Sequence, residues 1–271
     1  TALQRLAEDC GLSHISVDAY VERVRGVMPD QPANPATPAI AGGGKVDQIG
    51  LFTTAAPGIS VSNLAFTNQK NLHLLNTIKP DQVMDAALFD FLFCCQDRHA
   101  QNIFIDEQSN LKLIDNDLML GGAQKGRNAD NICTPSSLFL PMNMESWRVR
   151  TSPSKLGHLD YRCHMDSSDS LPDIPTGGNA KLTQCLGELA GMTVEAVQKK
   201  YGIAQLNAAA GLRERATDLK EHGFAEALRR SQREMKEKFD KAENRPEGEK
   251  LKHWHTNLWR PLEEPHCQKK A

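Results

Sequence analysis

The sequence predicts an α+β fold, and two segments of the chain carry that prediction. Between residues 181 and 239 apolar residues recur with the period of a helix. This period indicates helices near 182–190, 193–200, 205–220 and 223–242. Two short apolar runs, 103–105 and 111–114, are separated by five polar residues, which indicates a β-hairpin. We therefore expect a largely helical molecule with a short hairpin inside it.

The residues ahead of the hairpin predict a smaller amount of mixed structure. A helix-like pattern opens the chain and ends at Gly11, a residue suited to closing a helix. An insertion rich in Pro, Ala and Gly occupies 29–44, and a short apolar strand is expected over 48–54. A helix is then expected over 80–94, with proline in its first turn, directly before the hairpin.

Composition excludes some classes of function and leaves others open. The 271 residues carry a formal net charge of -2, so there is no global basic field and nucleic acid is not the expected partner. No apolar run reaches the roughly 18 residues of a membrane span. The seven cysteines include no C-x-x-C pair, which argues against a zinc ribbon. Cys133, Cys163 and Cys185 could be bridged in an oxidising compartment or be thiols in a reducing one, so cytoplasm and secretory pathway both remain open.

The segment around the predicted hairpin concentrates polar groups of one chemical kind. Asp97 and Asn102 precede its first strand, and Asp115 follows its second. Because a hairpin begins and ends at the same edge of a sheet, we expect these side chains to lie close together. One carboxylate can orient an attacking hydroxyl, while the amide oxygen and the other carboxylate hold Mg²⁺ or Mn²⁺ against nucleotide phosphates. The pattern indicates phosphoryl transfer, whereas Asp106, between the strands, is expected to be a turn former.

The run D-R-H-x-x-N, followed by a hairpin and I-D, resembles the catalytic segment of phosphatidylinositol 3/4-kinase-like enzymes over about residues 85–120. The resemblance implies a protein-kinase-like fold, with a mostly α-helical C-terminal lobe, a short catalytic β-hairpin and a partial N-terminal lobe. It implies ATP with Mg²⁺ or Mn²⁺ as cofactors. The reaction it implies is transfer of the γ-phosphate to a hydroxyl of a lipid or protein substrate.

Carried over position by position, the resemblance gives Asp97 and His99 the catalytic-loop roles. It gives Asn102 a metal role and makes Asp115 the metal-binding aspartate. Asn116-Asp117 departs from the family's Phe-Gly and is similar to an Asp-Asn feature of secretory-pathway protein kinases. The departure leaves the choice among lipid, protein and other substrates open.

Each of three side chains in this segment has two possible roles. His99 is either a proton acceptor or a packed residue that holds the loop. Arg98 is either the structural partner of a nearby carboxylate or the anchor of an activation-like segment. Asp117 is either a second metal ligand or a helix cap.

The resemblance also makes predictions about the front of the fold. It makes Glu8 the ion-pair partner of a lysine on a strand that precedes residue 1, together with the phosphate-covering glycine loop. Gly44-Lys45 does not supply that loop, because a Walker motif requires glycine where Ala39 stands and Ser or Thr where Val46 stands. The chain is therefore expected to be a fragment or a processed product.

The predicted domain organisation follows the same reading. Residues 1–58 are expected to form a remnant of the N-lobe with its hinge, 59–245 a kinase-like C-lobe, and 246–271 a C-terminal tail. The oligomeric state is left open.

Two other functions compete with a kinase. The first is a pseudokinase or interaction scaffold that lacks a complete nucleotide site. The second, the least favoured, is a metallophosphoesterase, whose D-x-H block is present but whose later G-D-x-x-D and G-N-H blocks are not. Weaker still are metal readings of two clusters, Cys94-Cys95 with His99 and His158 with Cys163 and His164.

Overall fold

The computed structural model has an α+β fold with two compact units. It describes residues 1–27, 43–66, 71–116, 119–120, 135, 137–141, 156, 159–167, 169 and 171–243, with side chains as far as 234. Contacts group Thr1 and residues 18–55 into a smaller unit and the rest into a larger one. The stretch predicted as an N-lobe remnant, 1–58, is thus divided, because residues 2–17 belong to the larger unit. The predicted tail, 246–271, lies outside the described residues.

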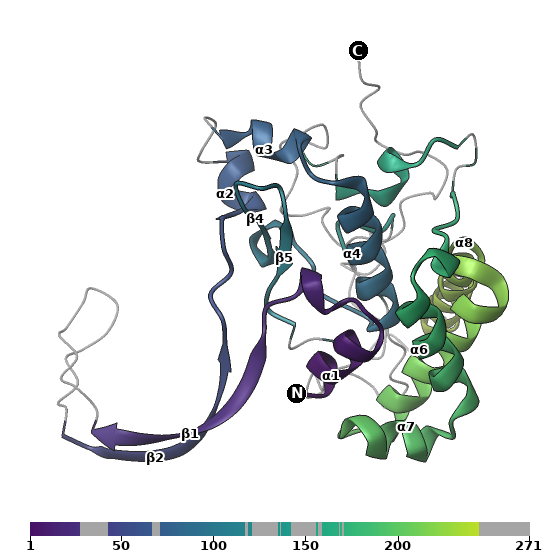
Figure 1. Ribbon diagram of the computed structural model, residues 1–271. Coiled ribbons are helices and arrows are strands. Elements are labelled where there is room, and N and C mark those ends of the chain that lie inside the picture. The colour runs from purple at the N-terminus through teal and green to yellow at the C-terminus, as the bar shows by residue number, and fades with distance from the viewer. Residues whose placement is uncertain are drawn as a thin grey trace. The chain divides into compact units, whose positions relative to one another are not determined.

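The structure contains the helices and strands expected from the sequence, together with others over 19–27, 59–66 and 73–76 that the sequence left open (Figure 1). In chain order, with η denoting 3-10 helices, they are α1 (Ala2–Asp9), η1 (Ser13–Ile15), β1 (Ala19–Val27), β2 (Lys45–Thr53), β3 (Ile59–Ser60), α2 (Val61–Phe66), α3 (His73–Asn76), α4 (Pro80–Leu92), η3 (Ala100–Asn102), β4 (Ile103–Ile105), β5 (Leu111–Leu113), η6 (Tyr161–His164), η7 (Thr176–Gly178), α6 (Ala180–Gly191), α7 (Val194–Tyr201) and α8 (Leu206–Glu243). The predicted hairpin and the predicted helices of the C-terminal half are confirmed.

The smaller unit is a long antiparallel ribbon of two strands. β1 pairs with β2 from Ala19 opposite Thr53 to Val27 opposite Lys45. Arg23 donates two hydrogen bonds to Asp47 across the ribbon, at 2.5 and 2.8 Å. Aliphatic side chains stay exposed on it, most of all Ile49 at 75 %. A ribbon of two strands has little core of its own, so its stability depends on such cross-strand pairs.

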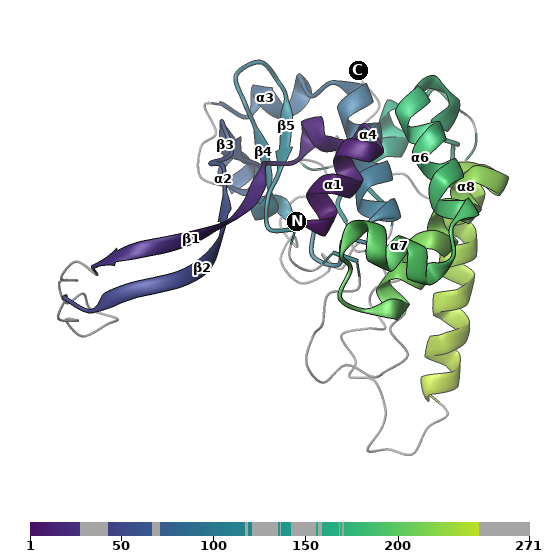
Figure 2. The ribbon, with the colours of Figure 1, turned by 60° about the horizontal axis from the view of Figure 1, so that its bottom comes forward.

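The core of the larger unit is built around α4. This helix is buried on more than one face, because Phe89 and Leu92 are inaccessible to solvent as well as Phe91. Phe91 packs edge-on against Phe224 of α8, with ring centroids 5.6 Å apart. α8 also packs against α4 more widely, and α6 and α7 in turn pack against α8 (Figures 1 and 2). Within the described residues, no helix is both long enough and apolar enough to cross a bilayer.

The two helices expected at 205–220 and 223–242 form one element, α8, with an internal break. Gly223 has φ 77° and ψ 173°, which are not helical angles. Asp173 accepts a hydrogen bond from the backbone N–H of Ala225, 2.9 Å long, and so caps the helix that restarts after the break. The two predicted helices are therefore the two halves of α8.

The first helix is fastened to the C-terminal helices. Gly11, at φ 69°, follows α1 as expected of a glycine that closes a helix. A disulfide joins Cys10 to Cys185 of α6, with Cα atoms 5.0 Å apart. Beside it Asp9 contacts the Lys200 ammonium at 3.1 Å and accepts a 2.9 Å hydrogen bond from the Tyr201 hydroxyl.

Disulfides involve most of the cysteines whose structure is described. Cys10, Cys94, Cys163 and Cys185 are disulfide-bonded, and Cys95 is a buried free thiol. Of the three cysteines for which bridging had been considered, Cys163 and Cys185 are bonded, and Cys133 lies outside the described part of the chain.

Replacing both Cys10 and Cys185 by alanine is expected to lower the free energy of unfolding by about 2–5 kcal/mol, because the bond closes a loop across 175 positions. Chemical denaturation without and with a thiol reductant measures this. Cys95→Ala is the matched control, since it removes a buried cysteine without removing a disulfide. A double variant as stable as the Cys95→Ala control in oxidising buffer would contradict the prediction.

Gly58→Ala is expected to destabilise the larger unit by at least about 2 kcal/mol. Gly58 has φ 88°, and a Cβ there would overlap the backbone of Ile105, to which β3 pairs. Gly187→Ala is the control, because Gly187 lies within α6 and a Cβ meets nothing within 4 Å. This control should be stabilising, as alanine is the better helix former. Urea denaturation of both variants tests the difference, and equal stabilities would refute it.

Candidate functional site

The candidate site lies at the connection between α4 and the β4–β5 hairpin. After α4 the backbone turns at Cys94, which has φ 53°, and continues through Asp97 to η3 and β4. β4 pairs with β5, and the chain leaves β5 through Ile114 and Asp115. The N–H of Ile114 donates to the carbonyl of Asn102 at 3.0 Å. Asn102 and Asp115 are thereby brought to the same end of the hairpin, as the sequence predicts.

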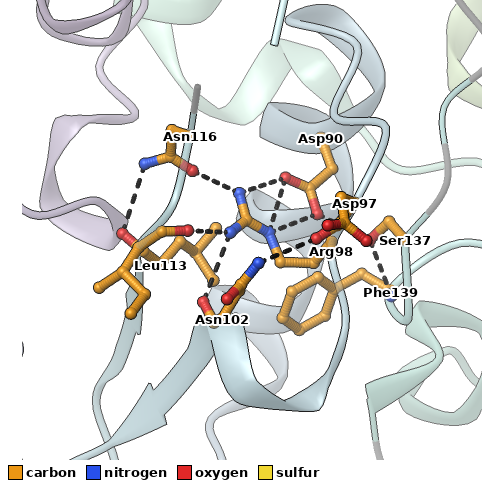
Figure 3. Close-up of polar contacts among 9 residues, drawn as sticks. Asp90, Asp97, Arg98, Asn102, Leu113, Asn116, Ser137 and Phe139 are labelled. Carbon is orange, nitrogen blue, oxygen red and sulfur yellow. Dashed lines mark hydrogen bonds and ion pairs between the residues drawn. The ribbon is translucent and has the colours of Figure 1, made fainter. Parts of the chain in front are cut away.

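Arg98 is the centre of the polar network at this end (Figure 3). Its side chain has no exposure to solvent, and neither does that of Asp90, its ion-pair partner from α4. Nε and Nη2 donate to the Asp90 carboxylate at 3.1–3.2 Å. Arg98 is therefore the partner of a buried carboxylate. Burial disfavours the charged guanidinium, but Asp90 outweighs that effect and raises the pKa of Arg98 above its ordinary value.

The remaining donors of Arg98 bind the two sides of the site. Nη1 donates to the carbonyls of Ile114, at 2.7 Å, and Asn102, at 3.4 Å. Nη2 donates to Oδ1 of Asn116 at 2.6 Å. One guanidinium thus holds the loop that precedes β4 against the turn that follows β5, and its rigid fork fixes their separation.

A third segment joins the network through Ser137. Its hydroxyl donates to Oδ2 of Asp90 at 2.7 Å and accepts a 3.1 Å hydrogen bond from the N–H of Phe139. The N–H of Leu138 donates to the carbonyl of Arg98 at 3.2 Å. Arg98 is therefore both a carboxylate partner and, through its backbone, an anchor for residues 137–139.

Asp97 and Asn102 are arranged differently from Arg98. The Asp97 side chain is 52 % exposed, so its carboxylate is available to a ligand. Nδ2 of Asn102 donates to the backbone carbonyl of Asp97 at 3.1 Å. This bond commits the nitrogen of a buried side chain, and Oδ1 has no hydrogen-bond donor among the described residues. The role of this oxygen as a cation ligand stays a prediction.

Asp115 has an unusual backbone conformation at the other side of the site. Its φ is 54°, in the left-handed region that non-glycine residues seldom adopt, and its side chain is exposed. Such a conformation costs about 1–3 kcal/mol and is held by its surroundings. The bond from Arg98 to the carbonyl of Ile114, one residue earlier, is part of what holds it.

His99 serves the loop and lies beside Asp97. Its Nδ1 accepts a hydrogen bond from the N–H of Gln101 at 3.2 Å, which caps η3. Nε2 therefore carries the proton in the neutral ring, and it lies 3.7 Å from Oδ2 of Asp97. The imidazole holds the loop and faces the exposed carboxylate, so its role in proton transfer stays a prediction.

The oxygen donors at this site fit a hard divalent cation. Asp115 and Asn102 supply a carboxylate and an amide oxygen, and Mg²⁺ uses one or two such ligands together with phosphates and waters. In the part of the chain with described structure, no group of three His, Cys, Asp or Glu side chains could hold a metal. The zinc reading of Cys94-Cys95 is wrong, because Cys94 is in a disulfide and burial raises the pKa of the Cys95 thiol to about 12.

The other predicted residues lie elsewhere or are not described. Glu8 is exposed on α1 and accepts a 3.0 Å hydrogen bond from Gln4. Asp117 and His158 lie outside the described residues. Asp106 is a turn former as expected, since its Oδ1 accepts from the N–H groups of Gln108 and Asn110.

Sequence reasoning missed Asp90 and Ser137 as members of the site. A signal for Asp90 was present: it is the one charged residue in the most apolar stretch, 86–95. A carboxylate in such a stretch requires a partner if it is buried, and Arg98 is the nearest cation along the chain. Ser137 carries no comparable signal, because serine is common in loops.

Removing one member of the Asp90–Arg98 pair is expected to be severe. Asp90→Leu or Arg98→Met leaves a buried charge without its partner, and each variant should lose about 3–5 kcal/mol of stability. The double variant Asp90→Leu/Arg98→Met should lose less than the sum, because no buried charge remains. Denaturation of all three tests this as a double-mutant cycle. Strictly additive losses would contradict it.

Comparison of the chain with protein-family models, with curated proteins and with solved structures finds no match. The family resemblance of the segment around residues 85–120 therefore stays a prediction, and the function is argued from the geometry of the site.

Proposed function

We propose that the chain is the metal- and nucleotide-binding part of an ATP-dependent phosphotransferase with a protein-kinase-like fold. The helical unit around α4 corresponds to a C-terminal lobe that carries the catalytic hairpin, and the β1–β2 ribbon corresponds to a partial N-terminal lobe. One observation supports this most: the residue before Asp115 is hydrogen-bonded to the Asn102 carbonyl at one end of the hairpin, and the side chain of Asn102 is bonded to the backbone of the exposed Asp97. The reaction is transfer of the ATP γ-phosphate to a hydroxyl of a lipid or protein.

The proposed roles follow from how each side chain is held. Oδ1 of Asn102 and the carboxylate of Asp115 hold Mg²⁺ or Mn²⁺, which supplies neutralisation of charge on the phosphate oxygens. Asp97 accepts the hydrogen bond of the acceptor hydroxyl and orients its oxygen towards the γ-phosphate. Nε2–H of His99 faces Asp97 and restricts the directions its carboxylate can take.

Positioning is the main contribution that these residues make. Phosphoryl transfer needs little covalent chemistry from the protein, so the placement of oxygens decides the rate. Arg98 contributes its rigidity rather than its charge, because Asp90 neutralises that charge at 3.1 Å. The carboxylates of Asp97 and Asp115 thus face solvent while a fully buried frame holds their backbone.

The disulfides support a compartment for this activity. Four of the five cysteines with described structure are disulfide-bonded. Such bonds persist in oxidising environments and are rare where thiol reductants are abundant. The phosphotransferase is therefore proposed to act in an oxidising compartment.

An interaction scaffold is the second candidate function, and the β1–β2 ribbon favours it. Val21, Ile49 and Leu51 are 60, 75 and 62 % exposed, which is unusual for neighbouring aliphatic side chains. A scaffold needs no transfer chemistry. It is therefore distinguished from an enzyme by the experiment that follows.

Mn²⁺ with ATP is expected to raise the stability of the chain by about 2.7 kcal/mol at a concentration one hundred times the Kd. Asp115→Asn and Asn102→Ala should abolish this gain, because each removes an oxygen ligand. Asp81→Asn is the matched control, since it removes an exposed carboxylate of α4 away from the site. Thermal denaturation with and without ligand measures the gain, and ATP turnover is followed with the same samples.

Two outcomes would count against the proposal in different ways. No gain in the unmodified chain rules out nucleotide binding by this chain alone. A gain that survives Asp115→Asn rules out the proposed metal site. Binding without turnover, unchanged by Asp97→Asn, supports the scaffold.

A further inference from the structure

We propose that Ser137 is a positioning residue of the phosphotransfer site, acting on Asn102 and Asp115 through Asp90 and Arg98. The inference deepens the proposed function. The effect of Ser137 on metal binding rests on that function, whereas its effect on the positions of Asn102 and Ile114 does not. Ser137 is fully buried, so its side chain is not exposed to a substrate. Any effect that it has on the site must pass through its hydrogen bonds.

The first link joins Ser137 to Asp90. The serine oxygen accepts the N–H of Phe139, and this leaves its own proton directed at Oδ2 of Asp90, 2.7 Å away. The hydrogen bond is buried and ends on a charged acceptor, the kind that contributes most. It determines how the plane of the Asp90 carboxylate is turned.

The second link joins Asp90 to Arg98. Oδ1 receives Nε and Nη2, and Oδ2 receives Nε, so the carboxylate faces one edge of the guanidinium. A guanidinium is planar, and turning one edge turns the others. The orientation of Asp90 therefore determines where Nη1 and the second proton of Nη2 point.

The third link reaches the metal-binding residues. Nη1 donates to the carbonyls of Ile114 and Asn102, and Nη2 donates to Asn116. Asp115 lies between two of these three acceptors along the chain. If the Ser137 hydroxyl is lost, Arg98 is the one remaining partner of the Asp90 carboxylate within the described part of the chain, and both side chains can turn. The carbonyls of Asn102 and Ile114 are then no longer held by the same guanidinium nitrogen of Arg98.

Ser137 could instead act as a local turn former. Amide hydrogen exchange distinguishes that role from the proposed positioning role. Amide hydrogen exchange of the ligand-free Ser137→Ala variant is expected to speed up about tenfold or more at Ile114 and Asn102, in addition to Leu138 and Phe139. Ser60→Ala is the matched control, since Ser60 is similarly buried and its hydroxyl accepts from Asn63 instead. Faster exchange confined to Leu138 and Phe139 would overturn the proposal.

A second measurement tests the consequence for the site. Mn²⁺ affinity of Ser137→Ala, titrated by electron paramagnetic resonance in the presence of ATP, is expected to fall about 10–100-fold, as when residues behind metal ligands are changed. Ser137→Thr keeps the hydroxyl and should retain most of the affinity. Ser60→Ala should lose stability without losing affinity. Equal Mn²⁺ affinities of Ser137→Ala and the unmodified chain would overturn the role.

The two failures are distinguishable. If the unmodified chain binds neither Mn²⁺ nor ATP, the proposed function fails. The exchange rates at Ile114 and Asn102 still decide whether Ser137 holds them.

Discussion

The buried ion pair between Asp90 and Arg98 is the interaction on which the rest of the site depends. Neither side chain has any exposure to solvent, so each would be costly to bury alone. A pair of this kind adds little net stability compared with apolar side chains, but it has strict geometric requirements. In this chain those requirements join α4, the loop before β4, the turn after β5 and residues 137–139 (Figure 3). Four stretches that are separate in sequence are thus held in one arrangement.

This arrangement divides the work between buried and exposed groups. The buried members have their charges and hydrogen bonds satisfied by one another. The exposed members, Asp97 and Asp115, project carboxylates from a backbone that the buried members hold. In the proposed function these oxygens bind a hard cation without rearranging, because phosphoryl transfer depends on groups that are already in place. The left-handed conformation of Asp115 is the local cost of that placement.

A second set of constraints holds the helices behind the site. The Cys10–Cys185 disulfide and the contacts of Asp9 with Lys200 and Tyr201 fasten α1 to α6 and α7. The aromatic contact between Phe91 and Phe224 joins α4 to α8. The C-terminal helices thus hold α4 in place, and Asp90, near the end of α4, pairs with Arg98. The β1–β2 ribbon forms a unit by itself, held by its ladder and by Arg23 with Asp47.

The sequence by itself determined the features that depend on neighbours in the chain. Periodicity predicts α4, α6 and α7. Two apolar runs with a polar turn between them predict the β4–β5 hairpin with Asp106, and the hairpin brings Asn102 and Asp115 to the same end. Tertiary structure alone decided which groups meet across long separations: Cys10 with Cys185, Asp173 with the break at Gly223, and Ser137 with Asp90. Local sequence patterns predict which face of a segment is buried and how its end is capped. They do not predict which distant group pairs with a buried charge. Many loop serines could do so, and the packing of the helices selects one of them.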